Sequence, residues 1–188
     1  MSASSSYLQA IESFSGVRVI ERQKFQSNDN SFYDLYHFND LQQIVFVQDS
    51  ISQSSKAGTL KGMHFQKGEF AQAKLINCIQ GSIMDFFVDL RSDQPTFMNY
   101  GSIKLDSANP KSLFIPRGFA HGYFTLEPNT VITYKLDNFY YPDQEYVLRW
   151  DDDQICIQWP NSSRYIISDK DKKGLSFLDL SARGIIRD

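Results

Sequence analysis

Cysteine is scarce in this chain: only Cys78 and Cys156 occur among 188 residues. Two cysteines are too few for a disulfide framework, and these two do not have the spacing of metal ligands. Both lie in apolar stretches of the sequence, so we expect two buried thiols.

The chain also lacks long apolar runs and an excess of positive charge. No run approaches the roughly 18 apolar residues of a membrane-spanning helix, and residues 1–6 have neither the positive start nor the apolar stretch of a signal peptide. The formal net charge is −3, and the sequence has no clustered basic face of the kind that binds nucleic acid. We therefore expect a cytoplasmic protein whose partners include neither a membrane nor a nucleic acid.

Aromatic residues are abundant, with 15 Phe and 10 Tyr. A hydrophobic share of 41% and an aromatic share of 14% are ample for a packed core, and aromatic side chains favour strands. Many short strand patterns separated by Gly, Pro and Asn turns predict an antiparallel sandwich or barrel rather than a βαβ fold. We expect one domain, with a lead-in over 1–15, a barrel over 16–160 and a C-terminal segment over 161–188 that packs on the barrel.

Alternation of apolar and polar residues, bounded by turn residues, predicts the individual elements. Strands are expected at 16–24, 32–38, 44–50, 100–105, 112–115, 122–126, 131–136 and 155–159, with two more between 73 and 90 that form a hairpin at Gln80-Gly81. The strands at 122–126 and 131–136 are expected to pair through the turn at 127–129. In the strand that precedes residue 90, Asp85 and Phe87 share one face and Phe86 the other. A polar loop is expected at 51–58, a short helical turn at 39–43, and a short helix or loop within 168–180.

The turn from Pro116 to His121 has the pattern PxGxxH, which resembles the second motif of the cupin (jelly-roll) superfamily. The first cupin motif places two histidines and a glutamate near the start of the barrel, and the corresponding positions here are His64, Gln66 and Lys74. A protonated lysine has no lone pair for a metal, and glutamine is a poor ligand for transition metals. We therefore expect no metal, and a metal-dependent dioxygenase or isomerase is disfavoured.

The same side chains suit removal of a proton from a carbon beside a ketone. Histidine is the natural base near neutral pH, a buried lysine can stabilise the oxygen of the enolate that forms, and a tyrosine on the opposite face can return a proton. A lone histidine on a strand is more often a core residue, so His64 becomes a candidate base only together with Lys74 and a tyrosine.

Five separate blocks of the sequence carry a closer resemblance. They read KGMHFQ (61–66), AQAKLINCIQGSIMDFFVDLRSDQPTF (71–97), LFIPRGFAHGYFTL (113–126), TYKLDNFYYPDQE (133–145) and RWDDDQICIQWP (149–160). In order and spacing, from about Val17 to Leu178, the chain resembles dTDP-4-dehydrorhamnose 3,5-epimerase. The resemblance implies an all-β fold, a cupin-type antiparallel jelly-roll barrel with short flanking helices. It also implies epimerisation of a nucleoside-diphosphate 4-keto-6-deoxy sugar at carbons 3 and 5 without a cofactor.

The resemblance implies a role for each residue of the proton-transfer set. His64 matches the base, and Asp171 matches the carboxylate that orients this base and raises its basicity. Lys74 lies where the family stabilises the enolate oxygen, with Asp85 beside its ammonium. Tyr134 matches the acid that reprotonates the carbon from the opposite face.

A further set of positions matches the family's substrate contacts. They are Gln48, Lys61, Tyr140 and Glu145 for the diphosphate and nucleoside, Tyr33 for stacking on the base, and Gln66 and His121 for the pocket wall. Tyr33 and Tyr140 have an equally ordinary interpretation as core or dimer-interface aromatics. The resemblance also implies a homodimer that exchanges its N-terminal strands, which would bring Tyr33 to the pocket of the other subunit.

Two departures from the family pattern affect the positions that bind the pyrophosphate in the family. Lys61 replaces an arginine, and the Asn-Asp-Asn-Ser sequence at 28–31 replaces an acidic–Arg–Gly turn. Arginine binds phosphate through two parallel hydrogen bonds, whereas lysine offers a point charge. The reaction class is expected to be kept, while the exact nucleotide sugar stays open. The alternatives are an epimerase that acts at one carbon, and a barrel that binds a nucleotide sugar without turning it over.

Overall fold

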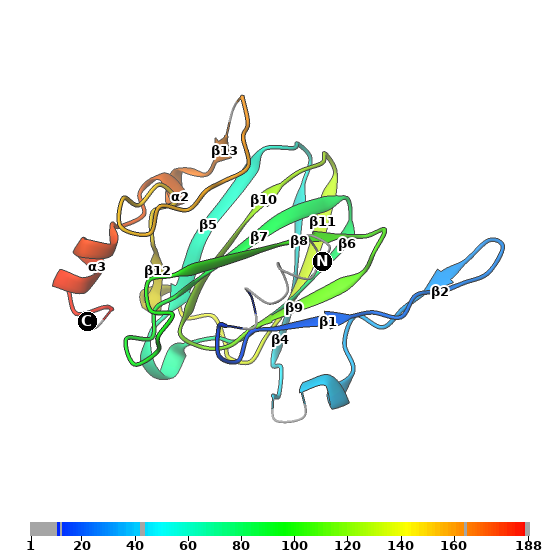
Figure 1. The fold of residues 1–188 in the computed structure, drawn as a ribbon, viewed down its shortest axis with the longest axis horizontal. Coiled ribbons are helices and arrows are strands. Elements are labelled where there is room, and N and C mark those ends of the chain that lie inside the picture. Colours follow the sequence, from blue (N-terminus) through cyan, green and yellow to red (C-terminus); the bar gives the residue numbers. More distant parts are fainter. Residues whose placement is uncertain (1–10, 12, 42–43, 164, 187–188) are drawn as a thin grey trace.

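Two β-sheets face each other in this computed structural model, which describes residues 11, 13–41, 44–163 and 165–186 (Figure 1). The five-stranded sheet has the order β1 (Arg18–Glu21), β9 (Lys111–Ile115), β6 (Lys74–Gln80), β11 (Thr130–Leu136) and β4 (Gln48–Ser54). The six-stranded sheet has the order β12 (Glu145–Val147), β5 (Thr59–Gln66), β10 (Phe119–Thr125), β7 (Ser82–Asp89) and β8 (Tyr100–Asp106), and β13 (Ile166–Ile167) lies parallel to β5. The pairs along both of these orders are antiparallel.

Short elements flank the sheets. They are the hairpin of β2 (Phe25–Gln26) and β3 (Ser31–Phe32), the 3-10 helices η1 (Phe38–Leu41), η2 (Gly68–Phe70) and η3 (Pro142–Gln144), and the helices α2 (Asp169–Lys172) and α3 (Phe177–Ala182). The β2–β3 hairpin projects away from the barrel (Figure 1). The short helix expected within 168–180 is confirmed, and the helical turn expected at 39–43 begins at Phe38. No helix among the described residues is both long and apolar enough to cross a membrane.

Apolar side chains of both sheets fill the space between them. Phe87 of β7, Leu113 of β9 and Ile132 of β11 are almost completely buried in this core. Of the lead-in expected over 1–15, residues 1–10 and 12 lie outside the described residues, while Ile11 and Phe14 pack into the same core.

The C-terminal segment covers the other face of the six-stranded sheet. Phe177 and Leu180 of α3 belong to a second buried cluster, which also contains Phe86 of β7. Phe86 and Phe87 therefore lie on opposite faces of one strand, as the alternation predicted. Asp152, which is 4% exposed, anchors the start of α3, because its carboxylate accepts a hydrogen bond from the Phe177 amide at 2.8 Å. This attachment matters because α2, which contributes to the cavity described below, belongs to the same segment.

Both expected hairpins are wrong. Strands β6 and β7 follow each other across Gly81, yet β6 belongs to the five-stranded sheet and β7 to the six-stranded one. Strands β10 and β11 are likewise in different sheets. A turn signal indicates only that the chain reverses direction, and Gly81 does so with a φ of 72°. Which sheet each strand joins depends on how the apolar faces of the strands are buried, and that is a property of the whole fold.

Several boundaries also differ from expectation. β4 spans Gln48–Ser54, so part of the expected loop at 51–58 is strand, and its polarity reflects alternating half-buried and exposed side chains. Only Ser31–Phe32 forms a strand near the expected 32–38, and no strand forms at 155–159. Cys156 is exposed rather than buried because it lies in a loop, where its φ is 54° and its thiol donates to the Asp153 carbonyl. Cys78 is buried, as expected.

Close contact between β10 and β5 requires glycine at position 122. A Cβ atom on Gly122 would lie 2.4 Å from the Lys61 carbonyl oxygen and 2.8 Å from Met63 Sδ. We expect Gly122→Ala to lower the free energy of unfolding by about 1–3 kcal/mol, the usual cost of overpacking, in urea denaturation. Gly62→Ala is the matched control on the paired strand, because its new Cβ would meet the mobile end of Leu60 at 3.0 Å and should cost less. Equal losses in the two variants would contradict this interpretation.

Candidate active site

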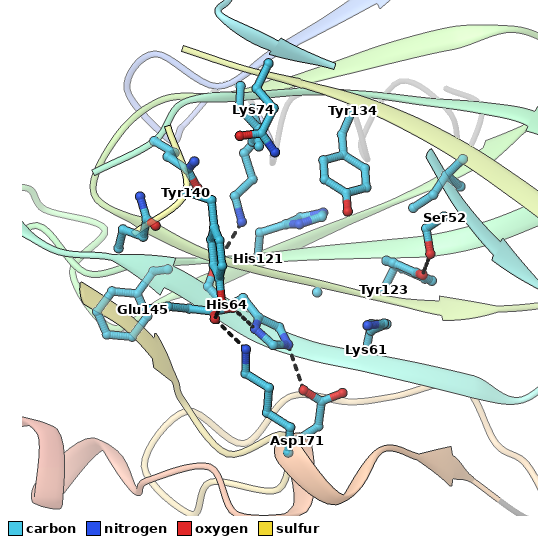
Figure 2. Close-up of a pocket in the computed structure, with 18 of the residues that line it drawn as sticks. Ser52, Lys61, His64, Lys74, His121, Tyr123, Tyr134, Tyr140, Glu145 and Asp171 are labelled. Atoms are coloured by element: carbon cyan, nitrogen blue, oxygen red, sulfur yellow. Dashed lines mark hydrogen bonds and ion pairs between the residues drawn. The ribbon is translucent and has the colours of Figure 1, made fainter. Parts of the chain in front are cut away.

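A cavity of about 310 Å³ opens between the two sheets (Figure 2). Strands of both sheets contribute to its wall, and the C-terminal segment closes one side with α2 and the residue before it. The lining residues are Gln48, Ser52, Lys61, His64, Phe65, Gln66, Gln72, Lys74, His121, Gly122, Tyr123, Ile132, Tyr134, Leu136, Tyr140, Glu145, Ser168, Lys170 and Asp171.

His64 of β5 is held by two carboxylates. Its Nε2 lies 2.7 Å from Asp171 Oδ1, and its Nδ1 lies 2.8 Å from Glu145 Oε1 (Figure 2). Asp171 is 1% exposed and sits in the first turn of α2, where Ser168 caps the helix by accepting from the Asp171 amide. Burial would raise the pKa of Asp171, but the hydrogen bond and charge of His64 outweigh burial, so that its pKa is lowered. The buried carboxylate therefore stays ionised and fixes the ring.

Glu145 connects His64 to the mouth of the cavity. Its Oε1 faces the imidazole, while its Oε2 is bonded to the Lys170 ammonium and accepts from the Tyr140 hydroxyl at 2.6 Å. Burial alone would raise the pKa of Glu145, but the hydrogen bonds from these three groups outweigh it and leave the pKa lowered. Glu145 is therefore an ionised acceptor between the imidazole and two polar groups at the surface.

Lys74 of β6 places an ammonium in the cavity wall. Its Nζ donates to the His64 carbonyl oxygen at 3.2 Å. Burial lowers the pKa of Lys74 to about 8, although the negative charges of Asp85 and Glu145 oppose this shift. At neutral pH the side chain is still mainly positive, and it is poorly solvated.

His121 of the cavity wall is paired with the buried Asp85 behind it. Nε2 of His121 is 3.0 Å from both carboxylate oxygens of Asp85, which is 0% exposed. Burial lowers the pKa of His121 and raises the pKa of Asp85, and the charge of each opposes the shift in the other. Because Lys74 also interacts with Asp85, its ammonium has a nearby negative charge inside the fold.

Tyr134 comes from the opposite sheet, on β11. Its ring enters the cavity across from His64, with His121 between them in the view of Figure 2. Burial and the charge of Glu145 raise the pKa of Tyr134, so the phenol keeps its proton near neutral pH. A base and an acid on facing walls can act on the two faces of one planar carbon.

Most of the expected site residues meet in this one cavity. Those that line it are His64, Lys74, Tyr134, Asp171, Gln48, Lys61, Gln66, His121, Tyr140 and Glu145. Asp85 supports the wall from behind through His121. The amide of Gln66 is bonded to the main chain of Phe70, Phe139 and Tyr141, which makes it an anchor for two loops.

Tyr33 does not line the cavity of its own chain. It directly follows β3 of the β2–β3 hairpin, which projects away from the barrel (Figure 1).

Sequence reasoning missed other lining residues and one central contact. The missed residues include Ser52, Tyr123, Ser168 and Lys170. Lys170 could have been noticed because it precedes Asp171. The contact between Glu145 and His64 could not, because it depends on the pairing of β12 with β5, which sets Glu145 opposite Gln66. The described residues contain no group of three or more His, Cys, Asp or Glu side chains that could hold a metal ion.

Comparison with known proteins places this chain in one family. The family model described as dTDP-4-dehydrorhamnose 3,5-epimerase matches residues 12–179. The enzyme of that name from Escherichia coli K12 is 36% identical over 162 residues, which cover 84% of this chain and 87% of the relative. The chain belongs to the dTDP-4-dehydrorhamnose 3,5-epimerase family. It is an epimerase, a type of isomerase.

Solved structures of dTDP-4-dehydrorhamnose 3,5-epimerases agree with this assignment. The enzyme from Bacillus anthracis, determined with TDP and PPi bound, is 39% identical with a TM-score of 0.83, covering 87% of this chain and 95% of that one. The Legionella pneumophila epimerase, solved in complex with dTDP-4-keto-L-rhamnose, is 30% identical with a TM-score of 0.83, covering 90% and 92%. The expected cupin-type jelly roll is thereby confirmed.

The charge state of Lys74 can be measured directly. In side-chain ¹⁵N NMR of the free protein, we expect one lysine resonance to titrate near pH 8, because burial lowers the pKa of Lys74 to about 8. Lys74→Met, which removes the ammonium, should abolish that resonance and leave the other lysines unchanged. A Lys74 resonance that titrates near the ordinary value of about 10.4 would contradict the described burial.

Proposed function

We propose that the protein converts dTDP-4-dehydro-6-deoxyglucose to dTDP-4-dehydrorhamnose by inverting carbons 3 and 5, with its own side chains and no cofactor. The observation that carries the proposal is the carboxylate-bound His64 on one wall of the cavity, with Tyr134 on the facing wall and Lys74 between the sheets. A protein that only bound a nucleotide sugar would have no use for a base and an acid on opposite sides of its ligand.

Each inversion exchanges one proton for another at a carbon beside the 4-keto group. A ring nitrogen of His64 takes the proton, and the electrons of the broken C–H bond move into the carbonyl to form an enolate. The Lys74 ammonium donates a hydrogen bond to the developing oxyanion. Tyr134 then donates its hydroxyl proton to the opposite face of the carbon, leaving a phenolate. The raised pKa of Tyr134 supports this role, because the acid must be protonated when the enolate forms.

The proposed substrate suits the charge of the cavity. Its anionic nucleotide would face Lys61 and Lys170, which lie at the wall with Gln48. The relatives support a dTDP sugar in particular, because the Legionella pneumophila structure holds dTDP-4-keto-L-rhamnose. A lysine at position 61 binds phosphate without the forked geometry of arginine. We therefore expect the protein to discriminate less strictly among nucleotide sugars whose diphosphates differ in geometry. We also propose that the reaction takes place in the cytoplasm.

Removing the base should abolish turnover without abolishing binding. We expect His64→Ala to lower kcat at least 100-fold, the smaller end of the usual contribution of a general base, with the Kd for dTDP within tenfold of the unchanged protein. Tyr134→Phe should also lose inversion, because no proton reaches the second face. Product formation is followed by NMR, which also shows whether one or both carbons are inverted.

His37→Ala is the matched control, since His37 is an exposed histidine whose ring accepts from the Asn39 amide, away from the cavity. It should keep full activity. Full activity in His64→Ala would refute the base assignment, and loss of activity in His37→Ala to the same degree would show that the assay reports folding rather than chemistry.

We propose that the active protein is a homodimer that exchanges its N-terminal β2–β3 hairpin. Phe25 and Phe32 of that hairpin are 57% and 60% exposed in the single chain, and Ile51 on the edge strand β4 is 59% exposed. Exposed phenyl groups on a projecting arm and the outer edge of a strand that exposes an isoleucine are surfaces that association would cover. Exchange of the arm would also give Tyr33 a pocket to act in.

Light scattering at micromolar protein should therefore give twice the mass of the chain. Phe32→Glu should raise the dimer Kd at least tenfold, because it puts a charge into an apolar contact. Leu178→Glu on α3 makes the same change at a side chain that is 62% exposed, and it should leave the dimer intact. A monomeric unchanged protein, or equal weakening by the two substitutions, would contradict the proposed interface.

A further inference from the structure

We propose that Glu145 is a positioning residue that holds His64 in a protonated form, unable to act as a base, until an anionic nucleotide enters and releases it. This inference rests on the proposed function, because it concerns when His64 can take a proton from the sugar.

Both ring nitrogens of His64 face a carboxylate. An ionised carboxylate only accepts hydrogen bonds, so a ring nitrogen that faces one must carry a proton. Nδ1 of His64 faces Glu145 at 2.8 Å, and Nε2 faces Asp171 at 2.7 Å. With both carboxylates ionised, both nitrogens donate, and the ring is an imidazolium. An imidazolium has no lone pair, so this arrangement cannot remove a proton from carbon.

The two carboxylates differ in how easily they can leave the ring. Asp171 is 1% exposed and belongs to a capped helix turn. Glu145 begins β12 at the cavity wall, and the two groups bonded to its other oxygen are at the surface: the Lys170 side chain is 54% exposed, and Tyr140 is exposed as well. Glu145 is therefore the partner that can move when the mouth of the cavity is occupied.

A nucleoside diphosphate has the charge to cause that movement. Lys170 is bonded to Glu145 and lines the cavity. A diphosphate competes with the Glu145 carboxylate for the Lys170 ammonium, and it repels the carboxylate itself. As the Glu145 carboxylate leaves the ring, it takes the proton from Nδ1 of His64 and releases it to solvent at the mouth of the cavity. The ring keeps its Nε2–H bond to Asp171 and gains a lone pair on Nδ1.

The pH dependence of this step involves the charged and titratable groups around the ring. They are Glu145 of β12, Asp171 and Lys170 of α2, Lys74 of β6, His121 of β10, Lys61 of β5, Tyr134 of β11 and Tyr140 before η3. Glu145 is the one whose charge can be removed by a nearly isosteric change while the Asp171 contact remains. Glu145→Gln is therefore the informative variant.

Calorimetry with dTDP as the probe tests the proposal without any need for turnover. In buffers of different ionisation enthalpy near pH 7, dTDP binding to the unchanged protein should release up to about one proton per site, as linkage requires when a bound proton is lost. Binding to Glu145→Gln should release almost none, and Glu69→Gln, which removes the same charge from an exposed side chain, should behave like the unchanged protein. Absence of proton release from the unchanged protein, or equal release from Glu145→Gln, would overturn the proposal.

Kinetics provide a second readout that a purely structural role would not move. Because the free enzyme must lose a proton to become active, kcat/KM should fall at acidic pH. Glu145→Gln should shift that acidic limb to lower pH, and Glu145→Asp, which keeps the charge, should shift it less. An acidic limb at the same pH in Glu145→Gln would also overturn the proposal. If no variant turns the sugar over, the proposed function fails, while the calorimetric result still decides the role of Glu145.

Discussion

The proposed chemistry of this barrel depends on the buried ammonium of Lys74. It lies in the wall of the cavity, close enough to interact with Asp85 and Glu145, and burial lowers its pKa to about 8. A poorly solvated positive charge interacts strongly with a negative charge that appears near it. A metal cupin keeps a carboxylate at the corresponding sequence position, and a carboxylate would attract a cation and repel an enolate. In the proposed mechanism, this exchange of one residue type suits the site to stabilise a transient oxyanion rather than to hold a metal ion.

The two-sheet fold supplies the geometry that this charge needs. His64 and His121 come from paired strands of the six-stranded sheet, while Lys74 and Tyr134 come from the five-stranded sheet. In the proposed reaction, a carbon held between the sheets has His64 as the base on one side and Tyr134 as the acid on the other. The C-terminal segment completes the site, because it packs on the outer face of β5 and brings Asp171 to the ring of His64.

The sequence predicted the type of fold and most of the cavity, and its failures have physical causes. Alternation along β7 placed Phe86 and Phe87 on the correct faces because side-chain direction in a strand is a local property. Pairing is not local, so turn signals at Gly81 and 127–129 suggested hairpins where the chain crosses between sheets. His64 and Asp171 are 107 positions apart, and family resemblance alone connected them. No local pattern indicated that Glu145 reaches the same ring.

The most direct test of the account is to run the reaction of dTDP-4-dehydro-6-deoxyglucose in D₂O and to locate deuterium in the sugar by NMR and mass spectrometry. Proton transfer through an enolate predicts deuterium at carbons 3 and 5, the two positions beside the 4-keto group, and at no other carbon. Inverted product that carries no solvent deuterium at these carbons would contradict the account, because the base and the acid would then not exchange their protons with water.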